Sequence, residues 1–216
     1  MDRWKGQAKS VEVLKSFIVL EGLDGAGTTT QLTLLDRRLD AVDVPHYCTF
    51  EPTGGAVGRL IRDILGKKLH VHPRTLALLF AADRTEHIGS EGIRSHLERG
   101  ELVICDRYLF SSLAYQSIGC GFEYVLSINQ DFPLPELLLF VETPPEICQQ
   151  RRQSRSRLDL FDSVSFQKEV QRRYQLAIDE FRLTSMKVCR VDGASEADEI
   201  GEKIWNIIEE LSIIKS

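Results

Sequence analysis

The stretch FIVLEGLDGAGTTTQLTLL, residues 17–35, is the strongest single indication of the fold. It begins as a mainly apolar strand, turns through a glycine-rich loop and continues as an amphipathic helix. Glycines let the backbone come close to phosphate oxygens, and the following helix presents free N–H groups to an anion. An ordinary glycine-rich turn is the alternative interpretation. The pattern predicts a phosphate-binding loop made of Gly22, Gly25, Ala26, Gly27, Thr28, Thr29 and Thr30.

One position of this loop departs from the usual pattern. Phosphate loops normally run G-x-x-x-x-G-K-[ST], and here Thr28 stands where the lysine is expected. Thr29 keeps the position whose hydroxyl normally ligates Mg²⁺. The loop therefore has the backbone and the hydroxyl of a phosphate site without its usual positive charge.

Short apolar runs alternate with longer amphipathic ones along the rest of the chain. Strands are expected at 17–21, 45–50, 101–106, 136–142 and 186–192. Helices are expected at 28–41, 56–66, 73–99, 108–117, 144–155, 164–182 and 195–213. This succession predicts an α/β fold with a doubly wound five-stranded parallel sheet and ligands at the carboxyl ends of the strands.

Length and composition limit the class of protein. The 216 residues fit one domain, with residues 1–15 expected as an N-terminal tail and 16–216 as a single domain carrying a short lid at about 151–163. The net charge of −5 argues against a partner nucleic acid, because such proteins usually carry a basic excess. The five cysteines form no C-x-x-C pair, and no apolar run reaches the length of a membrane span. We expect a reduced, cytoplasmic protein with no membrane partner.

Two further motifs carry side chains suited to a nucleotide. In ALLFAADRTEHI, Phe80 and Arg84 lie four residues apart and share a helix face, so they could stack on a base and bond its edge. In VICDRYLFSSLAYQ, Asp106 and Arg107 directly follow a buried strand, where a carboxylate could position Mg²⁺ and an arginine could hold a phosphate. Taken singly, a buried Phe beside a surface Arg, or an ion pair at a strand end, would explain each motif as well.

These motifs together resemble the thymidylate kinase family, which transfers the γ-phosphoryl group of ATP to dTMP. The resemblance runs from residue 17 to about 211. It rests on FIVLEGLDGAG, EPTGGAVGRLIR, LLFAADR, DRYLFSSLAYQ, VETPPEICQQRR and VDGASEADEIGEKIWNII. It implies a P-loop nucleoside monophosphate kinase-like fold, Mg²⁺ with ATP as co-substrate, and a homodimer.

The resemblance also implies roles for residues of the acceptor site. Asp24 would bond the 3′-hydroxyl, Phe80 would stack on thymine and Arg84 would reach the base carbonyl. Arg107 would hold the acceptor phosphate, and Tyr115 would crowd the 2′ position against ribonucleotides. The full set expected to bind dTMP is Asp24, Glu51, Pro52, Phe80, Arg84, Arg107, Ser111, Ser112, Tyr115 and Gln116.

Three positions that often carry a cation in this family are neutral here. Besides Thr28, Leu160 replaces a lid arginine and Phe50 replaces an arginine before E-P. We hypothesise that arginines of the segment RRQSRSR compensate, so the expected catalytic residues are Asp106, Arg107, Arg155 and Arg157, with Thr29 and Asp106 at the metal. The alternatives are a non-catalytic nucleotide-binding protein of the same fold, or a kinase for another deoxynucleotide or a deoxynucleoside.

Overall fold

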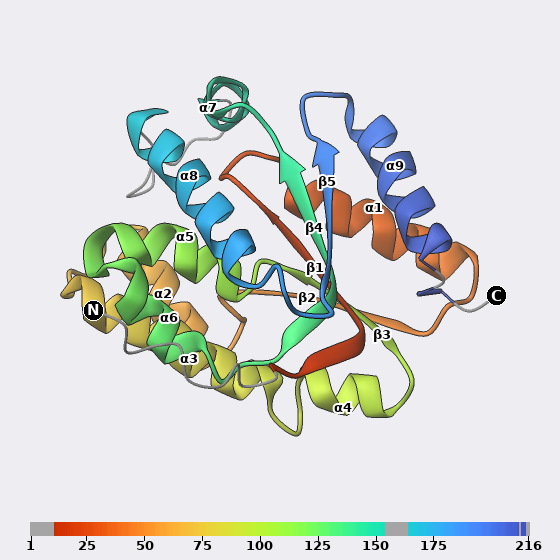
Figure 1. Ribbon diagram of the computed structural model, residues 1–216, viewed down its shortest axis with the longest axis horizontal. Coiled ribbons are helices and arrows are strands. Elements are labelled where there is room, and N and C mark those ends of the chain that lie inside the picture. The colour runs from red at the N-terminus through yellow and green to blue at the C-terminus, as the bar shows by residue number, and fades with distance from the viewer. Residues whose placement is uncertain (1–10, 154–163, 212, 215–216) are drawn as a thin grey trace.

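Five parallel strands form one sheet within the residues that the structure, a computed structural model, describes, namely 11–153, 164–211 and 213–214 (Figure 1). The strand order is β2-β3-β1-β4-β5. The chain leaves the central strand β1 toward β2 and β3 on one side and later adds β4 and β5 on the other, so the order reverses at β1. The strands are β1 (Val13–Gly22), β2 (His46–Phe50), β3 (Leu102–Asp106), β4 (Leu134–Glu142) and β5 (Lys187–Asp192).

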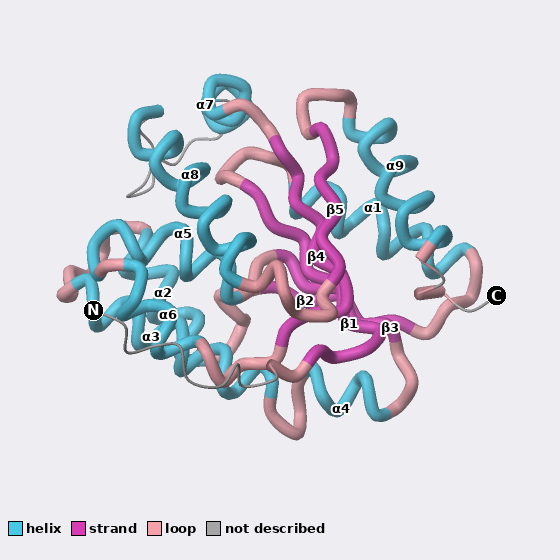
Figure 2. Tube along the Cα trace, in the orientation of Figure 1, coloured by secondary structure: helices cyan, strands magenta, loops and turns pink. Residues whose placement is uncertain are grey.

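Helices cover both faces of the sheet (Figure 2). One face packs against α1 (Thr28–Ala41) and α9 (Ala197–Glu210), and the other packs chiefly against α5 (Leu109–Cys120) and α8 (Val164–Glu180). The remaining helices are α2 (Ala56–Leu65), α3 (Pro73–Ile88), α4 (Ile93–Glu98), α6 (Phe122–Asn129) and α7 (Pro145–Gln153). The predicted fold class is confirmed.

The side chains of the central strand β1 contribute to the apolar clusters on both faces of the sheet. Successive strand side chains point to opposite faces, so Ile18 and Leu20 join the cluster under α1 and α9, whereas Phe17 and Val19 join the cluster under α5 and α8. All four side chains are fully buried. A strand buried on both faces reads as a continuous apolar run, which is why the sequence pattern located it.

Three features differ most from those expected. Strand β1 begins at Val13, before the predicted end of the tail at residue 15, and its register with β4 shifts between Leu14 and Ile18, where Ser16 adopts a φ of 57°. The helix predicted over 73–99 is divided at residues 89–92 into α3 and α4. Helix α6 was not expected. None of the described helices is both long enough and apolar enough to cross a membrane.

Candidate active site

The glycine loop joins β1 to α1 at the carboxyl edge of the sheet. Gly25 and Gly27 have φ values of 92° and 103°, in the region that side chains rarely adopt. A Cβ on Gly25 would lie only 2.6 Å from the carbonyl oxygen of Cys148 in α7. Gly27 caps α1 without a side-chain hydrogen bond to the first helical N–H groups. The loop and the helix start therefore have the geometry of an anion site.

The predicted metal pair comes together across the loop. Thr29 Oγ1 donates to Asp106 Oδ2 at 2.6 Å. Oδ1 of Asp106 is buried and accepts no hydrogen bond from any residue that the structure describes. A buried carboxylate oxygen without a partner is costly. A hydroxyl and a carboxylate are both oxygen ligands, so this pair fits a hard divalent cation such as Mg²⁺.

Arg107 lies between the acceptor side and the glycine loop. Its guanidinium forms an ion pair with Asp24 at 2.7 Å and donates to the carbonyl of Gly22 at 3.1 Å. Its backbone has a φ of 73°, and its N–H donates to the carbonyl of Leu20 at 2.9 Å, which holds this turn against the central strand. The predicted acceptor-phosphate ligand thus stands beside the predicted donor-phosphate loop.

A cavity of about 440 Å³ opens between the glycine loop and α3. It is large enough for a nucleotide-sized ligand. The Asp24 N–H donates to the Tyr115 hydroxyl at 3.0 Å, and burial raises the pKa of Tyr115, so that phenol stays protonated. Of the predicted residues, the cavity is lined by Asp24, Thr29, Glu51, Pro52, Phe80, Arg84, Asp106, Arg107, Ser111, Tyr115 and Gln116.

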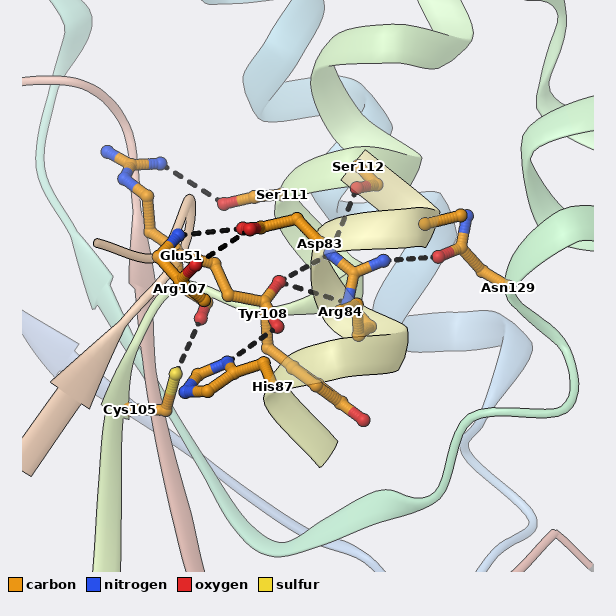
Figure 3. A network of polar contacts seen from close by, with 12 residues as sticks. Glu51, Asp83, Arg84, His87, Cys105, Arg107, Tyr108, Ser111, Ser112 and Asn129 are labelled. Carbon is orange, nitrogen blue, oxygen red and sulfur yellow. Dashed lines mark hydrogen bonds and ion pairs between the residues drawn. The ribbon is translucent and has the colours of Figure 1, made fainter. Parts of the chain in front are cut away.

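Arg84 lines the cavity and belongs to a buried polar network (Figure 3). Its Nε and Nη2 donate to Glu51 Oε2 at 3.0 and 2.6 Å, its Nη2 also donates to Ser112 Oγ at 3.1 Å, and its Nη1 donates to Asn129 Oδ1. His87 Nδ1 lies 3.1 Å from the other Glu51 oxygen. These contacts use four of the five guanidinium N–H groups, so one remains for a ligand within the described network.

This network adds contacts to two residues of the expected acceptor site. Glu51, expected to frame the acceptor phosphate, lines the cavity, and its buried carboxylate is stabilised by Arg84 and His87. Ser112, expected to line the base, is not among the residues that line the cavity and accepts a hydrogen bond from Arg84. Both expected roles remain predictions. Both residues position the Arg84 guanidinium.

A second buried carboxylate, Glu21, supports the loop after β3. It accepts hydrogen bonds from the backbone N–H groups of Tyr108 and Ser111 at 2.9 and 3.0 Å. The hydroxyls of Ser111 and Tyr174 donate to its other oxygen at 2.7 and 2.8 Å. Burial raises the pKa of Glu21 to about 7, against the opposing charge of Arg107 and these hydrogen bonds.

Sequence reasoning missed several residues of the site. Arg62 lines the cavity while its guanidinium donates to the carbonyls of Pro52 and Thr53, each at 2.6 Å. It lies within the quoted EPTGGAVGRLIR motif, which could have indicated it. Asn129 comes from the unexpected helix α6, so no local pattern pointed to it. Further lining residues are Leu32, Phe50, Leu65 and Tyr108.

The arginine-rich segment is described only in part. The predicted catalytic Arg155 and Arg157, and Leu160, lie outside the described residues. Arg152 passes beside the glycine loop, since a Cβ on Gly25 would lie 3.0 Å from its Cγ. Nη1 of Arg151 donates to the carbonyls of Gly193 at 2.9 Å and Ala26 at 3.4 Å. At least two arginines of α7 therefore reach the loop that lacks a lysine.

Comparison with known proteins finds one family over most of the chain. Residues 20–204 match the family described as Thymidylate kinase. The chain is 38% identical over 209 residues to a protein named putative thymidylate kinase from Treponema pallidum, covering 95% of this chain and 100% of that protein. It is 36% identical over 206 residues to a thymidylate kinase from Carboxydothermus hydrogenoformans, covering 91% and 98%. A probable thymidylate kinase from Methanocaldococcus jannaschii is 40% identical over 166 residues, covering 76% and 82%.

Proposed function

This chain belongs to the thymidylate kinase family, and we propose that it phosphorylates dTMP with the residues of one continuous cavity. The reaction transfers the γ-phosphoryl group of ATP and produces dTDP and ADP. The observation that carries the assignment of residues is that Asp24 and Thr29 of the glycine loop line the same cavity as Phe80 and Arg107. Donor and acceptor groups can therefore meet in one cavity.

The acceptor half recognises a pyrimidine deoxynucleotide. Phe80 stacks on the base, and the remaining Nη1–H of Arg84 donates to a base carbonyl. Tyr115 and Asp24 contact the sugar, and the hydrogen bond from the Asp24 N–H to the Tyr115 hydroxyl at 3.0 Å keeps both residues in place. Arg107, now paired with Asp24, holds the acceptor phosphate, because a dianion attracts the guanidinium more strongly than one carboxylate does.

The donor half combines the glycine loop with a metal pair. The free N–H groups at the start of α1 bind the donor phosphates. Thr29 and Asp106 hold Mg²⁺, which when bound neutralises phosphate charge. Since the acceptor is a phosphate monoester that is largely dianionic at neutral pH, no strong general base is required. The chain's own task is to align the two anions and exclude water.

The charge missing at Thr28 is supplied by arginines. Electrostatic groups aimed at transition-state charge are worth on the order of 3 kcal/mol each, so an uncompensated loss would slow transfer by roughly 100-fold. Arg152 already lies against Gly25, which makes it a candidate beside Arg155 and Arg157. We expect Arg152→Ala or the double change Arg155→Ala with Arg157→Ala to lower kcat, whereas the exposed Arg172→Ala on α8 leaves it unchanged. If Arg152→Ala and the double variant both kept the kcat of the unaltered protein, the proposal that these arginines compensate for Thr28 would be refuted.

The test of the function is a direct assay. Purified protein with ATP and Mg²⁺ is offered each deoxynucleoside monophosphate in turn, and ADP and diphosphate are measured. We expect turnover with dTMP above the other acceptors. Binding of dTMP without any product would support the non-catalytic alternative, and preferred turnover of another acceptor would reassign the substrate.

Two further properties of the family are proposed for this chain. A homodimer is supported by exposed leucines on neighbouring helices, with Leu60 of α2 39% and Leu78 of α3 50% exposed. Leu60→Glu and Leu78→Glu together should convert a dimer to a monomer in sedimentation equilibrium, and a monomeric unaltered protein would refute the proposal. A cytoplasmic location is supported by the five free cysteines.

A further inference from the structure

Three side chains with metal-ligating atoms gather outside the lining of the cavity, where the second half of α1 passes the edge strand β2. Asp36 and Asp40 are one helical turn apart on α1. His46 and Cys48 are two residues apart on β2 and so point to the same side of the sheet. The ligand atoms of Asp36, His46 and Cys48 all lie within 4.8 Å of one another. The Nε2 atom of His46 lies 3.9 Å from Asp40 Oδ1.

The orientation of the His46 ring calls for a cation at this place. Its Nδ1 lies 2.7 Å from the carbonyl oxygen of Val44, which can only accept, so Nδ1 carries the hydrogen. Its Nε2 then faces Asp36 Oδ1 at 3.2 Å. In a neutral imidazole, a lone pair of Nε2 would meet the lone pairs of the carboxylate. Either a proton on Nε2 or a metal ion between the two atoms removes this repulsion.

The sulfur of Cys48 favours a metal ion over a proton between His46 and Asp36. Cys48 adds a sulfur atom to the imidazole and the carboxylate, within 4.8 Å of the ligand atoms of both His46 and Asp36. Thiolate, imidazole and carboxylate together are the ligand types that Zn²⁺ takes in proteins. The bond from Nδ1 to a backbone carbonyl is the outer-shell contact that zinc-bound histidines usually make.

We propose that Asp36, His46 and Cys48 form a Zn²⁺ site. The site is separate from the oxygen pair Thr29 and Asp106, which suits Mg²⁺. None of its three ligands lines the cavity, so the ion has a structural role, and water or the exposed Asp40 would complete its shell. It links α1, whose first turn belongs to the glycine loop, to β2, which leads into Glu51 and Pro52 of the cavity wall.

The experiment uses the full-length protein after treatment with a chelator and desalting. Co²⁺ is the spectroscopic probe, because a thiolate ligand produces an intense near-ultraviolet charge-transfer band and a tetrahedral site produces visible d–d bands. Zn²⁺ affinity is measured by displacement of Co²⁺ and by calorimetry. We expect both sets of bands, one equivalent of Zn²⁺ per chain, and an unfolding temperature that rises with Zn²⁺ concentration.

The matched variants are Cys48→Ser and Cys189→Ser. Both cysteines are partly buried on edge strands of the sheet and pack against the same apolar cluster. We expect Cys48→Ser to abolish the charge-transfer band and weaken Zn²⁺ binding by at least about 10-fold, the lower end of the loss seen even for outer-shell partners. Cys189→Ser should retain the charge-transfer band and the Zn²⁺ affinity of the unaltered protein. Absence of Co²⁺ bands in the unaltered protein, or a band that survives in Cys48→Ser, would overturn the site and leave His46 and Asp36 as a simple ion pair.

Discussion

Glu21 gives the fold a pH dependence whose sign follows from its burial. The carboxyl lies beneath the loop after β3, is completely buried and accepts hydrogen bonds from two backbone N–H groups and two hydroxyls. The perturbation is Glu21→Gln. An amide keeps one acceptor oxygen for the N–H groups of Tyr108 and Ser111, and its NH₂ can donate to the hydroxyls of Ser111 and Tyr174, which then rotate.

The magnitude comes from the raised pKa. The unfolded carboxyl loses its proton near pH 4.5 and the folded one near pH 7. Between these values the folded state holds the more protons, so the free energy of unfolding falls as the pH rises. The full difference corresponds to about 3 kcal/mol, present below pH 4.5 and lost by the time the pH has passed through 7.

The assay is urea unfolding of both proteins between about pH 4.5 and 8.5. The free energy of unfolding of the unaltered protein minus that of Glu21→Gln should fall by about 3 kcal/mol over this range. The control is Glu169→Gln, because hydrogen bonds from Arg172 and Arg173 lower the pKa of this half-exposed carboxyl to about 2. Its difference curve should be flat above about pH 5.5. A flat difference curve for Glu21→Gln would refute the reasoning.

Three further outcomes test the site. Glu51→Gln should lower the free energy of unfolding by about 3 to 5 kcal/mol, because it leaves the buried Arg84 without its anionic partner. The control Arg172→Ala, at an exposed ion pair, should lower it by no more than about 1 kcal/mol. Equal losses for the two variants in urea unfolding would contradict this. Phe80→Ala should raise the Kd for dTMP by about 5- to 150-fold in calorimetry, since base stacking is worth about 1 to 3 kcal/mol, and an unchanged Kd would mean that Phe80 does not stack on the base. Asp106→Asn should raise the Mg²⁺ concentration needed for half-maximal turnover without changing the Kd for dTMP, and an unaltered Mg²⁺ requirement would remove Asp106 from the metal site.

Local patterns in the sequence located most of the fold. Helix α1 spans residues 28–41 as predicted, because its apolar face and the glycines before it are both local signals. The first strand was predicted to start at residue 17, four residues late, since the register shift around Ser16 interrupts the apolar run. Helix α6 was missed because only Val125 and Asn129 of its residues are fully buried, which leaves a weak periodic pattern.

Local patterns in the sequence indicated only part of the candidate site. The glycine loop, Thr29, Asp106 and Arg107 were recognisable because they lie at or soon after the ends of expected strands, and parallel strands end at one edge of the sheet. The structure places them together, and their roles in transfer remain predictions. The contributions of Arg155 and Arg157 also remain predictions.

The sequence by itself determined the strands, the phosphate loop and the family, since these depend on residues that are close along the chain. Only the tertiary structure decided what the buried charges do. Glu51 and Arg84 are 33 positions apart, and Arg84 and Asn129 are 45 apart, so no local spacing indicated that they would pair. Burial removes water as a partner and requires each charged group to find one within the protein. That requirement pairs Glu51 with Arg84, and the expected place of Glu51 beside the acceptor phosphate remains a prediction.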